Sequence, residues 1–221
     1  MFHGIMERRK DRVRTTSPPH VTITHMFLSD YTPQVVTLLS ALTIVGQVIA
    51  LGLLALVLQR SSRVEQSISN WIVRHSVLLM LIVALVATGG SLFFSEIAGW
   101  TPCKLCWLQR IFMYPQVILL AVALWRKERS IAWYILALSI IGIIFSIVNY
   151  GEQVQAHLNP LPLGGSLKPC DASGVSCAGT EIKFAFGYVT IPLMAATAFL
   201  MNGLTSLLVL MSGNKLETVK G

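Results

Sequence analysis

Residues 100–116 read WTPCKLCWLQRIFMYPQ, and a short polar turn gives way there to a long apolar run. Pro102 suits the start of a helix, because its φ is already helical and it has no N–H to leave unpaired. Cys103 and Cys106 form a C-x-x-C pair that would lie in the first helical turn, where free N–H groups and the helix dipole stabilise a thiolate. Arg110 follows Cys106 by four residues, on the same face one turn deeper. The stretch predicts redox-active thiols at a membrane surface with a cation beneath them. The alternative is a structural disulfide with a snorkelling arginine.

The composition places this stretch in a helical membrane protein. The 221 residues are 54% hydrophobic and 12% charged, and the mean hydropathy is +0.67. Long apolar runs without the alternation of a β-barrel predict several membrane-spanning helices. The net charge of +7 comes from 17 basic and 10 acidic residues, and in a membrane protein such charge mostly sets topology. We therefore expect membrane lipid as a partner and no nucleic acid.

Five apolar runs are long enough to cross a hydrocarbon core of ~30 Å as helices. They cover residues 35–58, 77–98, 107–125, 131–150 and 188–211. Residues 1–33 are polar and carry a basic cluster between positions 8 and 14. Residues 151–186 form the one long loop, which is rich in Gly and Pro. The sequence thus predicts an all-α membrane protein with five spans.

The charge of the loops predicts which side of the membrane the cysteines face. Two spans separate Cys103 and Cys106 from the second pair, Cys170 and Cys177, so both pairs lie on one side. The loops on the other side and the C-terminal tail hold eight Lys and Arg, against three in the cysteine-bearing loops. The positive-inside rule therefore places all four cysteines outside the cell membrane. The N-terminus would also lie outside, with its basic cluster about 20 residues or more from the first span, at the edge of the range of the rule.

The second cysteine pair lies in the sequence PCDASGVSC, residues 169–177, inside the long loop. A loop so rich in Gly and Pro can bend and move. Local cysteine pairs suit disulfides on the oxidising side of a membrane, or a metal site. Thiol–disulfide exchange can pass two electrons between a mobile pair and a fixed pair through a mixed disulfide. The fixed pair then needs an electron acceptor.

An apolar groove at the membrane edge could hold a lipid-soluble quinone as this acceptor. Trp107, Phe112 and Tyr114 would roof the groove, and Arg110 could stabilise negative charge on a thiolate or on the reduced quinone. An arginine inside a span is costly and marks a functional site by default. For Trp107 and Tyr114 the alternative is an interfacial aromatic belt.

Residues 103–115, C-x-L-C-W-x-Q-R-x-x-M-Y-P, resemble the disulfide-bond formation protein B family (DsbB), and are closest to its short BdbC-type members. The order of features is similar too, with C-x-x-C before the second of four core spans and a cysteine pair between core spans three and four. The sequence GYVTIP at 187–192 also resembles the family. The resemblance covers roughly residues 71–211.

The resemblance implies a membrane quinone reductase that reoxidises an extracytoplasmic, DsbA-like thiol oxidase of the thioredoxin fold, with ubiquinone or menaquinone as acceptor. Cys106 would face the quinone beside Arg110, and Cys103 would exchange with the loop pair. Cys170 would form the mixed disulfide with the partner, and Cys177 would complete the loop disulfide. The second pair is separated by six residues, fewer than in the best-known members.

The resemblance also implies a four-helix transmembrane bundle as the core, with one additional N-terminal transmembrane helix. The expected division is a basic tail over 1–33, the additional helix over 34–59, the redox core over 60–212 and a tail over 213–221. The additional helix is not part of the family's core, and the sequence assigns it no role. Because four spans and both pairs lie within residues 77–211, we expect the core to fold and turn over without residues 1–58.

Three other interpretations remain open at this point. Four cysteines could bind zinc, although no histidine stands at ligand spacing, and we expect no metal. The chain could be a structural membrane protein with two inert disulfides. It could also be another quinone-coupled thiol enzyme of the vitamin K epoxide reductase type, which places its C-x-x-C in the last core helix. Measurements of bound metal, free thiols and reactivity with quinone separate these cases.

Overall fold

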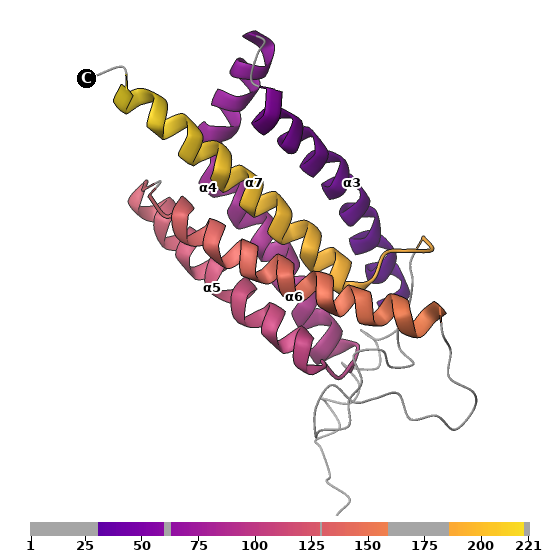
Figure 1. Ribbon diagram of the computed structural model, residues 1–221. Coiled ribbons are helices and arrows are strands. Elements are labelled where there is room, and N and C mark those ends of the chain that lie inside the picture. Colours follow the sequence, from indigo (N-terminus) through magenta and orange to yellow (C-terminus); the bar gives the residue numbers. More distant parts are fainter. Residues whose placement is uncertain (1–30, 60–62, 129, 159–185, 219–221) are drawn as a thin grey trace, which may run out of the picture.

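The fold is described from a computed structural model, which covers residues 31–59, 63–128, 130–158 and 186–218 (Figure 1). The N-terminal tail and the second cysteine pair lie outside these described residues. The elements are α3 (Thr32–Gln59), α4 (Arg63–Leu92), the π-helical turn η1 (Phe93–Ile97), α5 (Lys104–Arg126), α6 (Ala132–Leu158) and α7 (Ile191–Thr218). Five of these helices are long and apolar enough to cross a membrane. The prediction of an all-α membrane protein is confirmed.

Helices α4 to α7 pack side by side as an up-and-down bundle, and α3 packs against α7 (Figure 1). α7 also contacts α4 and α6, and α5 lies between α4 and α6. The turn between α4 and α5 lies at the same end of the bundle as the end of α6 and the start of α7 (Figure 1). The turn that carries the C-x-x-C and the two helix ends that flank the second cysteine pair therefore lie at one end of the bundle (Figure 1), as the count of crossings predicts.

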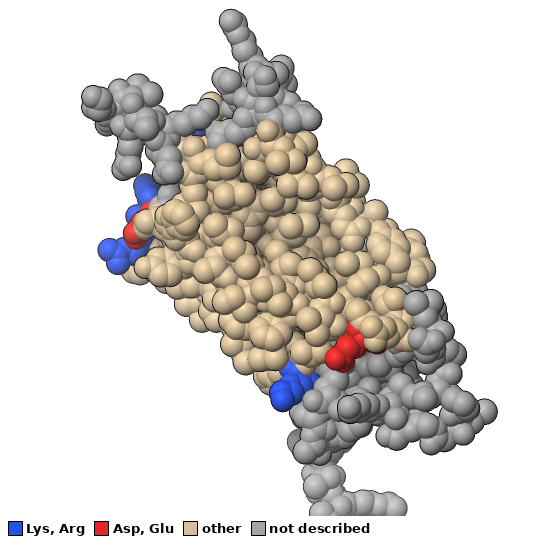
Figure 2. All heavy atoms as spheres, viewed as in Figure 1, with Lys and Arg blue, Asp and Glu red and all other residues tan. Residues whose placement is uncertain are grey.

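The surface and the interior have the polarity expected of a chain that spans a membrane. Large aliphatic side chains such as Leu51, Ile118 and Ile147 are exposed on the outside of the helices. In the view of Figure 2, charged side chains lie at the two ends of the molecule and the surface between them is uncharged. The interior is rich in small residues, since close backbone approach replaces the hydrophobic effect as the source of helix association in lipid.

Two contacts inside the bundle show how the helices are held in register. Gly142 of α6 lies against the ring of Phe199 on α7, so closely that an added Cβ would overlap the ring. On α7, the Asn202 amide donates to Gln116 Oε1 of α5 at 2.9 Å, and both side chains are fully buried. Such a bond between helices in a bilayer fixes rotation and depth, because neither amide finds water there.

All five spanning helices are longer than the apolar runs of the sequence predict, and α7 reaches Thr218 although a tail is expected from residue 213. α4 begins at Arg63, which the sequence assigns to a basic loop reaching to residue 76. α6 continues to Leu158, although the long loop is expected from residue 151. Gln153 illustrates the cause, because it is polar and yet buried within α6. Hydropathy marks where a helix leaves the membrane, whereas the helix itself continues for as long as a packed face and helix-forming residues support it.

Candidate functional site

The C-x-x-C pair lies at the start of α5. Cys103 is the N-cap, with extended backbone angles (φ −73°, ψ 172°), and its sulfur accepts the N–H of Cys106 at 3.4 Å. The helix therefore begins at Lys104, two residues after Pro102, because the Cys103 sulfur takes the capping position that Ser or Asp often fills. Cys106 lies in the first turn as expected. The two sulfur atoms are 3.0 Å apart, so the fold brings this pair together.

The hydrogen bonds around the sulfur atoms distinguish the two thiols. Cys103 donates to the sulfur of Cys106, and this bond, together with burial, raises the pKa of the Cys103 thiol. The buried amide of Asn149, on α6, lies 3.5 Å from the Cys106 sulfur, as a second donor. Donors favour the charged form of the group that accepts them. The arrangement makes Cys106 the sulfur that can carry negative charge and Cys103 its proton-bearing neighbour.

Arg110 is buried one turn below Cys106, with 8% of its surface exposed. Its Nε donates to Ser91 Oγ at 3.0 Å and its Nη2 to the Ser91 carbonyl at 2.9 Å. The guanidinium carbon lies 5.2 Å from the centre of the Trp107 ring, within the range of a cation–π contact. These three partners are neutral, so Arg110 brings a full positive charge to the site. The snorkelling alternative is difficult to reconcile with such burial.

The π-helical turn η1 shapes the part of the site between α4 and α5. The N–H of Ala98 donates to the Phe93 carbonyl, and that of Trp100 to the Phe94 carbonyl, both at 2.9 Å. Gly99 follows with φ +70°, which glycine adopts without strain. The turn stacks the ring of Phe94 on that of Trp100, with centroids 5.0 Å apart. π-helical turns are frequent at functional sites, and both rings line the cavity described next.

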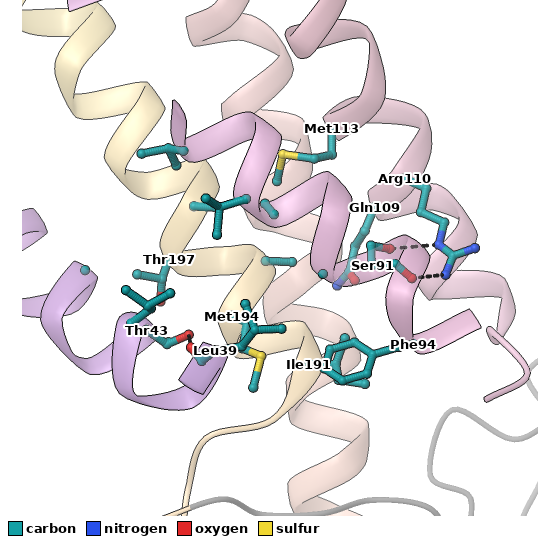
Figure 3. A pocket seen from close by; sticks show the side chains of 18 of the residues that line it. Leu39, Thr43, Ser91, Phe94, Gln109, Arg110, Met113, Ile191, Met194 and Thr197 are labelled. Atoms are coloured by element: carbon teal, nitrogen blue, oxygen red, sulfur yellow. Dashed lines mark hydrogen bonds between the residues drawn. The ribbon is translucent and has the colours of Figure 1, made fainter. Parts of the chain in front are cut away.

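A cavity of about 340 Å³ opens beside the cysteine pair (Figure 3). Cys106 and Arg110 line it from α5, and Ser91 and Phe94 line it from α4 and η1. α7 contributes a third wall and α3 a fourth. Most of the remaining lining is aliphatic, so the polar groups gather at the α5 side. A volume near ~300 Å³ is at the lower end of the range for small-molecule sites.

Two polar side chains that line this cavity have an atom without a hydrogen-bond partner. Gln109 Nε2 and the Tyr114 hydroxyl are both buried and unpaired among the described residues. Gln109 is 5% exposed. A buried amide or hydroxyl without a partner costs free energy. Both residues line the cavity, so a ligand whose hydrogen-bond acceptors reached these two atoms would satisfy them.

The site contains most of the residues that the sequence predicts. Cys106, Arg110 and Tyr114 line the cavity, and Cys103 bonds to Cys106. Trp107 is 53% exposed and lies over Arg110, outside the set of cavity-lining residues. The predicted roof residue Phe112 likewise packs elsewhere, with its ring stacked on Phe145. Cys170 and Cys177 lie outside the described residues, which contain no cluster of three metal-binding side chains.

Three residues of the site are missing from the sequence-based prediction. Gln109 is a polar residue inside a span, directly before Arg110, and this position alone could have marked it. Asn149 is polar near the end of another span. Ser91 gives no signal, because its contact with Arg110 depends on how α4 and α5 pack.

Comparison with known proteins identifies the family. The family described as Disulfide bond formation protein DsbB matches residues 73–209, which is more than half of the chain. The matched segment contains the C-x-x-C, Arg110, Gln109 and Asn149. It excludes α3.

Individual relatives agree with this assignment. "Disulfide bond formation protein C" of Bacillus subtilis is 42% identical over 136 residues, covering 62% of this chain and 91% of the relative. A "Probable disulfide formation protein" of Metapseudomonas resinovorans is 39% identical over 124 residues, covering 56% of this chain and 81% of the relative. "Probable disulfide formation protein C" of Halalkalibacterium halodurans is 40% identical over 129 residues, covering 58% of this chain and 88% of the relative. No solved structure gives a significant match. The chain therefore belongs to the DsbB family of disulfide bond formation proteins and is a multi-pass membrane oxidoreductase.

Proposed function

We propose that the chain is a thiol:quinone oxidoreductase, which carries two electrons from a reduced, DsbA-like thiol oxidase outside the membrane to a quinone in the bilayer. The observation that carries this proposal is the cavity beside the cysteine pair. Cys106 and Arg110 line it together with the unpartnered donors of Gln109 and Tyr114. Oxidation of the partner would supply disulfide bonds to exported proteins.

The residues of the cavity fit a quinone. A quinone ring carries two carbonyl oxygens, and Gln109 Nε2 and the Tyr114 hydroxyl are donors in need of acceptors. The aliphatic remainder of the lining suits the isoprenoid part of ubiquinone or menaquinone. A bound quinone would supply the acceptor for the two electrons and two protons that leave Cys103 and Cys106 as they close to a disulfide.

Arg110 would stabilise negative charge as it develops in the site. Its guanidinium is always charged and is held by Ser91, so it does not need to reorganise. The Asn149 amide would do the same for the Cys106 thiolate. Trp107 would act from outside the cavity, through its contact with the guanidinium.

The four cysteines would pass the electrons in two exchanges. A partner thiolate would attack Cys170, so that the partner dithiol closes to a disulfide while the Cys170–Cys177 disulfide opens to two thiols. The loop dithiol would then close while the Cys103–Cys106 disulfide opens, with Cys103 as the atom attacked. The cavity supports this division for the inner pair, because Cys106 lines it and Cys103 is not among its lining residues. The roles of Cys170 and Cys177 rest on the sequence.

Replacing Cys177 by serine tests the outer exchange. Without Cys177, Cys170 would be oxidised by exchange with the Cys103–Cys106 disulfide, and attack by the partner thiolate should then leave Cys170 in a mixed disulfide with the partner. This species should appear as a band on a non-reducing gel that reductant removes. If the band formed only on replacement of Cys103 or Cys106, the division of roles would be wrong. The extracytoplasmic side of both pairs is tested by a membrane-impermeant thiol reagent after reduction. Labelling from the cytoplasmic side alone would contradict the proposed topology.

The decisive experiment combines purified protein, a quinone and a reduced thioredoxin-fold protein, with quinone absorbance followed over time. We expect loss of quinone absorbance that depends on both the thiol protein and the chain. Disulfide formation in the thiol protein should match quinone loss one to one. Absence of quinone reduction with an intact, reduced C-x-x-C would refute the proposal.

A further inference from the structure

The additional N-terminal helix α3 is a packed part of the molecule, although it lies outside the segment that matches the family. Gly46 lies so close to α7 that an added Cβ would be 3.1 Å from Thr197 Cγ2. Ala50 and Leu53 are buried in a cluster with Leu204 of α7. The helix is also tied down by a hydrogen bond from the Tyr188 hydroxyl to Gln47 Oε1, at 2.8 Å. α3 therefore has a fixed face toward the bundle.

This face forms the wall of the cavity that is remote from Arg110 (Figure 3). The residues that line it from α3 are Leu39, Leu42, Thr43, Val45, Gly46 and Ile49. They extend over about 15 Å along the helix axis, at 1.5 Å per residue. The hydroxyl of Thr43 is satisfied by the Leu39 carbonyl at 2.7 Å. The α3 wall is thus apolar along its length, in contrast to the α5 wall, which holds Arg110.

The cavity opens toward the bilayer between α3 and α4. Leu42 and Val45 of α3 and Ile82 and Val86 of α4 line the cavity and are nevertheless exposed on the surface. We call the opening between these four side chains the lateral window. No charged side chain belongs to it, so an apolar chain can pass through it from the surrounding lipid.

We propose that α3 is the binding wall for the first isoprenoid units of the quinone tail, which leave the site through the lateral window. This inference rests on the proposed thiol:quinone activity and adds a residue set that the family match does not contain. The ring would lie at the α5 wall, where the unpaired donors are, and the tail against the α3 wall. The cavity of about 340 Å³ holds a ring and the start of a tail, and the rest of the tail stays in the bilayer.

A matched pair of substitutions on α3 tests the proposal. Val45 lines the cavity at the lateral window. Val48 lies three residues further along α3 and is not among the residues that line the cavity. Both are exposed to lipid, at 55% and 65%. Val45→Trp should fill the tail path, whereas Val48→Trp should only add surface toward lipid. Leu42→Ala, with Leu38→Ala as its control, removes part of the wall without any risk of steric clash.

Two measurements are made on the full chain. The first is the amount of long-tailed quinone that co-purifies with the protein, determined by extraction and chromatography. The second is the KM for a quinone with two isoprene units and for its tail-less analogue. Val45→Trp should lower the co-purified quinone and raise the KM for the tailed quinone by about tenfold, because even a misfit of one methylene in a hydrophobic pocket is worth roughly tenfold or more. The KM for the tail-less quinone should stay within about twofold.

The controls decide between the possible outcomes. Val48→Trp and Leu38→Ala should behave as the unchanged chain, and Leu42→Ala should shift the tailed KM in the same direction as Val45→Trp. The proposal that α3 binds the tail would be overturned if Val45→Trp and Val48→Trp changed the KM for the tailed quinone equally. It would also be overturned if Val45→Trp raised the KM for both quinones equally. Neither result would contradict the redox activity. If the unchanged chain reduced neither quinone, the proposed function would fail, and the tail site with it.

Discussion

The two opposite walls of the cavity differ in composition and in origin. The α5 wall carries the thiol of Cys106, the guanidinium of Arg110 and the amide of Gln109, and it lies within the segment that matches the family. The α3 wall carries aliphatic side chains and lies outside that segment. The difference suggests that chemistry and ligand fit are separable in this protein. A change on the α5 wall should alter turnover with every acceptor. A change on the α3 wall should alter which acceptors are preferred.

The largest expected effect is on the α5 wall, from Cys106→Ser. We expect quinone reduction to fall by at least about 10³-fold, as for the loss of a nucleophile in other enzymes. The co-purified quinone should stay within about twofold, because a serine keeps the shape of the wall. Turnover and quinone content are measured on the same preparation. Turnover that persists at a tenth or more of the original rate would mean that closure of the Cys103–Cys106 disulfide is not the step that reduces the quinone.

Arg110→Met should have the next largest effect. The KM for tailed and tail-less quinones should rise together by about tenfold, because a hydrogen bond to a charged group contributes ~1.5–3 kcal/mol. Arg110→Lys keeps the positive charge but loses the planar guanidinium with its several hydrogen-bond donors, so it should retain partial activity. Insertion should not suffer, since the cost of burying the charge is removed. Arg126→Met, at the exposed end of α5, serves as the control. Unchanged KM and kcat in Arg110→Met would remove this arginine from the site.

Gln109→Leu should weaken the site with little effect on stability. Its Nε2 has no partner among the described residues, so leucine removes a donor for the ligand without leaving a protein group unpaired, and the KM should rise about fivefold. Gln116→Leu is the matched control, because Gln116 is bonded to Asn202 and to the Phe112 carbonyl. That change should lower the Tm and leave the KM close to its original value. A fall in Tm for Gln109→Leu as large as for Gln116→Leu would assign Gln109 to packing instead.

Deletion of residues 1–58 should have the smallest effect on the chemistry. The α5 wall is intact in such a chain, so turnover with a tail-less quinone should stay within about twofold. The KM for a tailed quinone should rise, and the Tm should fall because the packing of Ala50 and Leu53 against α7 is lost. Membrane insertion, Tm and both kinetic constants are measured together. Complete inactivity of a correctly inserted deletion would show that α3 belongs to the redox site itself.

The sequence predicts those features that depend on short segments. Hydropathy finds five spans, and the spacing of Cys106 and Arg110 places them on one face of a helix. The start of that helix differs by two residues, since the capping role of the Cys103 sulfur is not visible in the order of residues. The polar beginning of α4 and the end of α6 are missed, because hydropathy reports membrane depth rather than helix length.

Features that depend on packing between helices could not be predicted. Asn149 reaches Cys106 across 43 residues and Ser91 reaches Arg110 across 19, and each contact requires the register of two helices. α3 is mostly apolar on all sides, with scattered Ser, Thr and Gln residues, so the face that lines the cavity is defined only once Gly46 lies against α7. Trp107 is the converse case, because its place in the motif suggests contact with a ligand and its ring lies outside the cavity.

The lateral window of the cavity determines which ligand concentration controls the occupancy of the site. An apolar ligand that enters between α3 and α4 arrives by diffusion in two dimensions, and the aqueous volume has no part in its arrival. The quantity that sets occupancy is then the mole fraction of ligand in the bilayer. Fusing the membrane with ligand-free lipid should slow the reaction as dilution with buffer slows a soluble enzyme, and a stiffer, more ordered bilayer should slow it further.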